Sequence, residues 1–145
     1  MRRQSYLGIM FPILAAFVVV CCARRTPPIH KFQILASTVW TRTNLVIPDK
    51  RMIRIEAIGA ISPNGHTYVD ANGSRDEDWN RYYNLYPGIN HCALIARIGP
   101  GGEVRFVGVS QTIKVLNGGE LLLGINDKDP DNNKGTFDVS VEILN

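Results

Sequence analysis

Cysteine is scarce in this sequence: there are three among 145 residues, and Cys21 and Cys22 are adjacent near the start. If the first 23 residues are removed as a leader, Cys92 stands alone and no disulfide can form within the remaining chain. Cys92 lies in the apolar run CALIARI, where we interpret it as a small buried hydrophobe; a nucleophile or an intermolecular bridge is the alternative. The Cys/His spacing of a zinc site is absent as well.

An excess of positive charge is also missing once the leader is set aside. Two of the 16 basic residues lie in it, which leaves 14 basic and 13 acidic residues, and this balance does not support a nucleic-acid-binding surface. A GxSxG nucleophile motif is absent, and His30, His66 and His91 stand in unrelated contexts. Paired carboxylates, with the acidic run 76–78 opposite Asp127, are the catalytic arrangement left open, but the sequence favours a protein that is not an enzyme.

Long apolar runs are missing except at the start, where residues 7–22 follow two arginines and Ala23 precedes two more. This pattern predicts a signal peptide at 1–23, cleaved after Ala23, and a secreted, periplasmic or cell-surface protein. Lipid modification at Cys22 is an alternative. An uncleaved anchor is another, although the run is short of the roughly 20 apolar residues of a membrane span. No membrane span is expected after the leader is removed.

The rest of the chain reads as a short linker at 24–31 and one domain at 32–145. The apolar runs of the domain are short, several alternate with period two, and turn signals rich in Pro, Gly and Asn separate them. The predicted strands are Phe32 to Trp40, Met52 to Ile58, Cys92 to Ile98, Val104 to Val107, Thr112 to Leu116, Glu120 to Ile125 and Thr136 to Leu144. No segment shows a sustained helical stripe. This pattern predicts an all-β fold, an antiparallel jelly-roll β-sandwich.

Between the last two predicted strands, one loop concentrates side chains with oxygen ligands. They are Asp127, Asp129, Asp131, Asn132 and Asn133. Calcium takes about six to eight oxygen ligands in a flexible geometry, which such a loop can provide together with backbone carbonyls. The alternative is that Asp, Asn, Pro and Gly are the ordinary composition of a connecting loop.

The longest segment without a strand period runs from Ser62 to His91, and it combines aromatic rings, among them Trp79 and Tyr82, with acidic residues. Long connections in compact domains are usually functional. Aromatic rings beside polar groups can hold a sugar by stacking on its apolar face. The alternative is that these rings only cover the open end of the sandwich.

A set of motifs in a fixed order covers nearly the whole domain: ALIARIG, FVG, GGELLLGIND and DNNKGTFDVSV. It closely resembles the PA-IL-like family of calcium-dependent galactophilic lectins and related galactose-binding-like domains. The resemblance implies a calcium ion at one end of the sandwich, which binds galactose through two neighbouring ring hydroxyls. Carried over by motif, the implied metal-binding residues are Asp127, Asn132, Asn133, Asp131 and Pro63. The first three provide side-chain oxygens, and backbone carbonyls provide the ligands near Pro63 and within 128–131, the stretch that ends at Asp131. The implied sugar-binding residues are Asp127, Asn132, Trp79 and Tyr82.

The sequence also departs from the family. The loop from Asp127 to Asn132 is two residues shorter and carries the additional acids Asp129 and Asp131, which would strengthen calcium binding or crowd out the sugar. The sugar-contacting histidine and glutamine of the family have no counterparts here.

The sequence therefore predicts a secreted, calcium-dependent, lectin-like protein that binds galactosides or glycoconjugates. The alternatives are a structural or protein-interaction module in which calcium only stabilises a loop, and an accessory subunit of a secreted complex. Because single sugar sites bind weakly, a homo-oligomer is expected on grounds of avidity.

Overall fold

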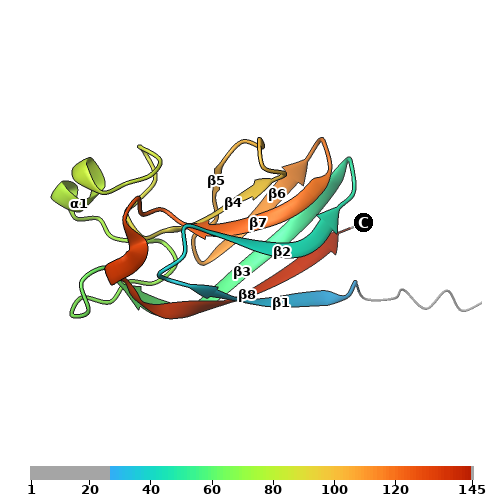
Figure 1. Ribbon diagram of the computed structural model, residues 1–145. Coiled ribbons are helices and arrows are strands. Elements are labelled where there is room, and N and C mark those ends of the chain that lie inside the picture. Colours follow the sequence, from blue (N-terminus) through green and yellow to red (C-terminus); the bar gives the residue numbers. More distant parts are fainter. Residues whose placement is uncertain (1–26, 145) are drawn as a thin grey trace, which may run out of the picture.

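The computed structural model describes residues 27–144, and this part of the chain folds into two four-stranded antiparallel sheets (Figure 1). The strands are β1 (Ile29–Leu35), β2 (Trp40–Ile47), β3 (Arg51–Ser62), β4 (Leu94–Ile98), β5 (Arg105–Phe106), β6 (Ser110–Val115), β7 (Gly119–Ile125) and β8 (Lys134–Leu144). One sheet has the order β1-β8-β3-β6 and the other β2-β7-β4-β5. This interleaved order is that of a jelly roll, so the expected antiparallel sandwich is confirmed.

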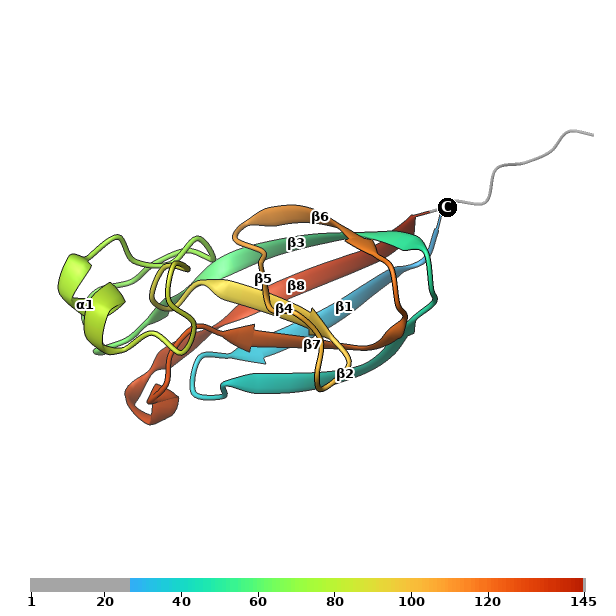
Figure 2. The same ribbon diagram turned by 90° about the horizontal axis from the view of Figure 1, so that it is seen from above.

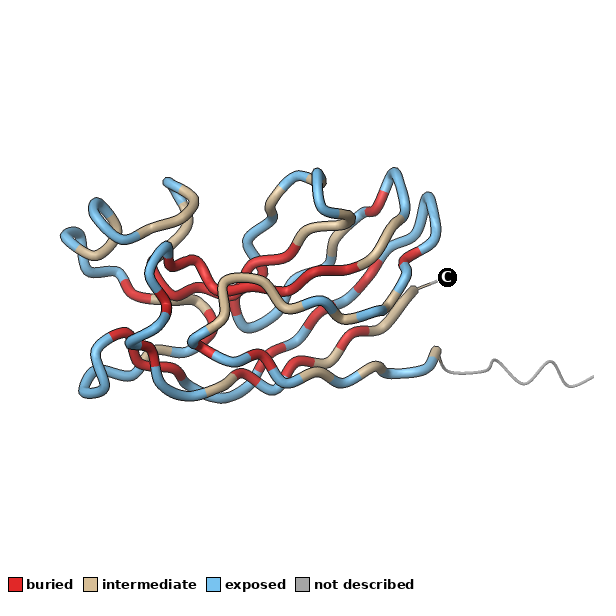
Figure 3. The backbone as a smooth tube through the Cα atoms, in the orientation of Figure 1, coloured by how far each residue is buried: buried red, intermediate tan, exposed pale blue. Residues whose placement is uncertain are grey.

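The period-two pattern of the sequence places the core between the sheets. In β3, Ile53 and Ile55 are fully buried, and Ile55 pairs with the buried Val141 of β8. The other sheet contributes Leu121 and Leu123 of β7 to the same core. Figure 3 shows the buried segments along the strands, continuing into the loops at one end of the molecule.

The outer face of the second sheet carries a smaller apolar layer, which explains why β7 does not alternate. Leu122 and Ile95 are buried although they lie outside the main core cluster. The ring of Trp40 lies against Gly124, where an added Cβ would be 2.7 Å from it, and makes an edge-to-face contact with Tyr86 at a centroid distance of 6.2 Å. Both faces of β7 are therefore covered from Leu121 to Ile125, and this part of its sequence has no polar side chain.

Strand β2 was not expected from the sequence, and the predicted strand from Phe32 to Trp40 is wrong in extent. The chain turns after Leu35, whose carbonyl accepts a hydrogen bond from the Thr38 N–H at 3.2 Å, and β2 begins at Trp40. Within β2 the register shifts between Arg42 and Val46. A register shift breaks the alternation of apolar and polar residues by which a strand is found in a sequence.

The long segment from Ser62 to His91 contains a short helix, α1 (Glu77–Tyr82), which the sequence did not reveal. Asp76 caps it, because its carboxylate accepts a hydrogen bond from the Trp79 N–H at 3.0 Å. Six residues are fewer than two turns, too few for an apolar stripe to become visible.

Both views place α1 and the loop between β7 and β8 at one end of the sandwich, whereas the start of β1 and the end of β8 lie at the other (Figures 1 and 2). No helix in residues 27–144 has the length and apolar character needed to cross a bilayer. The predicted leader at 1–23, the cleavage after Ala23 and the lipidation site Cys22 lie outside the described residues, as does the start of the predicted linker.

Phe137 has the largest of the fully buried side chains, so a substitution there tests where the hydrophobic core lies. We expect Phe137→Ala to lower the free energy of unfolding by about 3–5 kcal/mol, because apolar contacts are lost and a cavity is left. The control is Ile58→Ala in the neighbouring strand, where the side chain is 72% exposed and the change should stay within about 0.5 kcal/mol. Urea unfolding measures both; similar losses for the two variants would contradict this placement of the core.

Candidate functional site

The candidate site lies at the end of the sandwich that carries α1 (Figure 1). Antiparallel pairing brings the ends of β3 and β7 and the starts of β4 and β8 to this end, as the pairs Ser62–Lys134 and Leu94–Ile125 show. Residues just outside these strands, far apart in the sequence, therefore become neighbours.

Asp127 lies at the centre of this group, two residues after β7. Its side chain is 4% exposed. Its Oδ1 accepts a hydrogen bond from the Asp129 N–H at 2.9 Å, and its Oδ2 accepts one from Asn133 Nδ2 at 2.9 Å. Among residues 27–144 its one ion-pair contact is with His91 Nε2 at 3.6 Å. A carboxylate this deeply buried without a lysine or arginine partner is a favourable place for a cation.

Asn133 supplies a second oxygen atom. Its Nδ2 is held by two acceptors, the Ala36 carbonyl at 3.1 Å and Asp127 Oδ2 at 2.9 Å, which fixes the orientation of the amide. Its Oδ1 is buried and has no hydrogen-bond partner in the described part of the chain. Buried polar atoms are nearly always satisfied, so this oxygen beside a buried carboxylate fits an oxygen-coordinated cation.

A pocket of about 240 Å³ opens above these groups. Its lining consists of Pro63, Asn64, Trp79, Tyr83, His91, Asp127, Asp129 and Asn132. The structure thus brings together four of the residues expected from the sequence, namely Asp127, Asn132, Pro63 and Trp79. Asn133 is joined to them through its hydrogen bond to Asp127.

Besides Asn133, two of the expected residues do not line this pocket. Asp131 is exposed, and the acid that lines the pocket beside Asp127 is Asp129. Tyr82 is 55% exposed, and the ring that lines the pocket beside Trp79 belongs to Tyr83.

The choice of Tyr83 follows from the geometry of α1. Trp79 and Tyr83 are four residues apart, and such residues share one face of a helix, whereas Tyr82 faces elsewhere. Both rings contact His91, with centroid distances of 5.9 Å for Trp79 and 6.1 Å for Tyr83. The Tyr83 carbonyl accepts a hydrogen bond from the Lys128 N–H at 3.0 Å, which ties the helix to the loop after β7.

His91 and Cys92 join the site, although no motif in the sequence pointed to them. Both are buried, and Cys92 Sγ lies 3.9 Å from Asp127 Oδ2. Burial lowers the pKa of His91, against the opposing influence of Asp127 and Asp76. Burial also raises the pKa of the Cys92 thiol, and the Asp127 carboxylate adds to this effect. The expected burial of Cys92 is confirmed, but its polar neighbours depend on the way the chain folds.

Asn126 fixes the loop beside the site and was also missed. Its Nδ2 donates to the carbonyls of Tyr86 at 3.1 Å, Ile89 at 2.7 Å and Asn90 at 3.2 Å, and its Oδ1 accepts from the Tyr86 N–H at 2.8 Å. One fully buried amide thus connects the end of β7 with the loop before β4.

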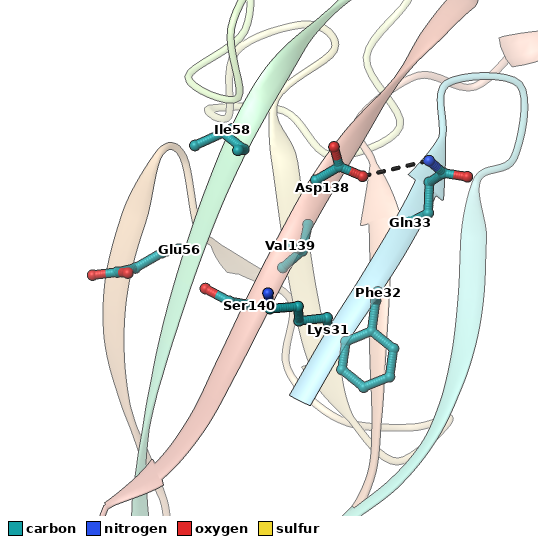
Figure 4. A pocket seen from close by; sticks show the side chains of 8 residues that line it. All are labelled: Lys31, Phe32, Gln33, Glu56, Ile58, Asp138, Val139 and Ser140. Carbon is teal, nitrogen blue, oxygen red and sulfur yellow. Dashed lines mark hydrogen bonds between the residues drawn. The ribbon is translucent and has the colours of Figure 1, made fainter. Parts of the chain in front are cut away.

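A larger hollow of about 700 Å³ lies on the outer face of β1, β8 and β3 (Figure 4). It is lined by exposed side chains of both charges, such as Lys31 and Glu56, and Gln33 Nε2 donates to Asp138 Oδ1 across it at 3.4 Å. It contains none of the residues expected to bind a metal or a sugar. Buried polar groups meet at the smaller pocket, which is therefore the candidate functional site.

No family model matches the sequence, and no curated protein matches it either. Among solved structures, the N-terminal domain of EclA, a PllA-like lectin, is similar with a TM-score of 0.61 and 20% identity. The similarity covers 79% of this chain and 95% of that domain. The chain therefore has the fold of a lectin β-sandwich, in agreement with the architecture implied by the resemblance of its motifs.

Removing the Asn126 amide tests its role in the loop. We expect Asn126→Ala to lower the free energy of unfolding by roughly 2–3 kcal/mol, because several backbone groups lose their partner at once. Amide hydrogen exchange should accelerate at residues 86–90. The control is Asn117→Ala in an exposed turn. Unchanged exchange at 86–90 would show that the loop does not depend on this amide.

The burial of His91 predicts a dependence of stability on pH. The unfolded chain binds a proton near the ordinary pKa of 6.5, whereas burial lowers the pKa in the folded state. In chelator, the free energy of unfolding should therefore be highest above pH 6.5 and decrease as the pH falls toward the folded-state pKa. His91→Gln should flatten the profile between pH 7 and 5.5, and His66→Gln, at an exposed position, should leave it unchanged. Urea unfolding at each pH measures the free energy of unfolding of the wild type and both variants. If this free energy changes equally with pH in all three proteins, His91 is not the group responsible.

Proposed function

We propose that this protein is a lectin-like, calcium-dependent carbohydrate-binding protein without catalytic activity. One observation carries the proposal: the buried Asp127 carboxylate lines a small pocket with aromatic walls, and it is hydrogen-bonded to Asn133, whose Oδ1 has no partner in residues 27–144. The fold shared with a lectin domain supports it.

The residues present fit calcium, which prefers oxygen ligands. Asp127, Asn133 and Asn132 would provide side-chain oxygens, and backbone carbonyls near Pro63 and within 128–131 would complete the set. This proposal keeps the carbonyl contribution expected near Asp131 and adds the Asp129 carboxylate, which lines the pocket. Bound there, calcium would offer coordination positions to two neighbouring hydroxyl groups of a sugar.

The pocket suits one sugar ring or the end of a glycan. Its volume of about 240 Å³ lies below the roughly 300–1,000 Å³ of pockets for drug-sized ligands. Trp79 and Tyr83 offer ring faces for the apolar side of a sugar, and Asp127 accepts hydrogen bonds from its hydroxyls. We infer galactosides as the first class to test, from the resemblance of the motifs.

The environment of Cys92 argues against an enzyme with a cysteine nucleophile. Cys92 lies beside His91 and Asp127, which resembles a nucleophile with its base. However, Cys92 has no exposed surface, and burial raises the pKa of its thiol, whereas a nucleophilic cysteine needs an accessible thiolate.

The second candidate function is an interaction or accessory module in which calcium stabilises the loop only. The additional carboxylate of Asp129 in the pocket favours it, because protein oxygens could then fill the coordination positions a sugar would need. Export to the cell surface or beyond and assembly into an oligomer belong to the proposal in both cases.

A glycan array tests the proposal, with the purified protein in calcium and then in excess chelator. We expect binding to a class of terminal sugars, galactosides first, that disappears with chelator. Asp127→Asn should weaken it by more than about tenfold, or about 1.4 kcal/mol, because the charge that holds the cation is lost. Asp131→Asn is the matched control at an exposed position and should bind like wild type.

Calcium-dependent stabilisation without binding to any glycan would favour the interaction module. Binding that persists in chelator, or in Asp127→Asn, would overturn the calcium-bridged site.

A further inference from the structure

Three side chains of the site carry ligand atoms that suit a different metal. His91, Cys92 and Asp127 each present one such atom, these atoms all lie within 4.8 Å of one another, and all three residues are buried. His91 Nε2 lies 3.6 Å and Cys92 Sγ lies 3.9 Å from Asp127 Oδ2. The resemblance of the motifs assigns no metal-binding role to His91 or Cys92.

The separations are close to those around a tetrahedral zinc ion. Zinc lies about 2.0–2.2 Å from nitrogen and oxygen ligands and about 2.3 Å from sulfur, so two ligands of one ion are roughly 3.3–3.6 Å apart. The nitrogen–oxygen and sulfur–oxygen distances here exceed that range by a few tenths of an ångström at most, and the ligand atoms of His91 and Cys92 lie within 4.8 Å of each other. Side-chain rotations that shorten these separations would bring the three atoms around one ion.

The backbone explains how two consecutive residues face the same carboxylate. In an extended strand, neighbouring side chains point to opposite faces. Cys92 instead has a φ of 62°, in the left-handed region that residues other than glycine rarely adopt. Its N–H donates to the Asn126 carbonyl at 3.0 Å, which holds this conformation at the entrance to β4. The alternation is broken at this point, and the two side chains meet at Asp127.

His91 is also free to bind. Its Nδ1 is buried without a hydrogen-bond partner in residues 27–144, and its Nε2 lies beyond hydrogen-bond distance of the carboxylate. Calcium has little affinity for imidazole or sulfur, whereas zinc prefers both. The donor set around Asp127 is therefore mixed: Asp129 and Asn132 in the pocket lining carry oxygen atoms, His91 in the same lining carries an imidazole, and Cys92 adds a thiol.

We propose that His91, Cys92 and Asp127 bind a zinc-class divalent ion, and that this ion and calcium exclude each other because both require Asp127. Binding deprotonates the Cys92 thiol, and the proton goes to solvent. The exclusion rests on the proposed calcium-dependent function, whereas the zinc-class site does not. Zinc would thereby antagonise sugar binding.

Cobalt reports the metal site directly, because a thiolate ligand gives Co²⁺ an intense near-ultraviolet charge-transfer band. We expect the metal-free protein to develop this band with one equivalent of Co²⁺, and zinc to abolish it. Cys92→Ser, which preserves side-chain size, should lose the band, and a thermal melt in chelator shows whether this variant is folded. The control is His66→Gln at an exposed position, which should keep the band. Absence of the band, or its persistence in Cys92→Ser, would overturn the site.

The exclusion has its own readout, the effect of zinc on glycan binding in calcium. Saturating zinc should weaken binding at least tenfold in the wild type and leave the Cys92→Ser variant unaffected. If glycan binding in calcium is the same with and without added zinc, the two ions do not exclude each other. The two proposals fail separately: a cobalt band without glycan binding refutes the proposed function, and calcium-dependent binding without a band refutes the zinc-class site.

Discussion

The Asp127 side chain is a carboxylate that is only 4% exposed to solvent. Other contacts have to replace the hydration that it loses on burial. Hydrogen bonds from the Asp129 N–H and Asn133 Nδ2 replace part of it. No lysine or arginine of residues 27–144 forms an ion pair with it. His91 and Cys92 also lie beside this carboxylate, so the segments before β4 and after β7 meet at it.

The sandwich supplies rigidity and the loops supply chemistry. Strand β7 is buried on both faces from Leu121 to Ile125 and leads directly into Asn126 and Asp127, so the position of the carboxylate is set by the core. Asn126 then fixes the loop before β4, and that loop brings in His91 and Cys92. Functional groups held on such a framework keep their geometry without the cost of ordering a flexible loop on binding.

The same carboxylate faces two kinds of ligand. Asp129 and Asn132, which line the pocket with it, carry oxygen atoms that suit a hard cation, and His91 and Cys92 beside it carry an imidazole and a thiol, which suit a softer one. This chain therefore combines the fold of a lectin β-sandwich with a buried group of imidazole, thiol and carboxylate at one end.

The sequence alone determined the sandwich, because alternation along strands such as β3 and β8 reports directly which face is buried. It also identified the loop with Asp127, Asn132 and Asn133, since oxygen-rich side chains gather there over a short stretch. The tertiary structure decided what depends on distant contacts: the bulged strand β2, the short helix α1, the choice of Tyr83 over Tyr82, and the approach of His91 and Cys92 to Asp127. Residues 35 positions apart meet only because β4 and β7 pair, and no local pattern records that pairing.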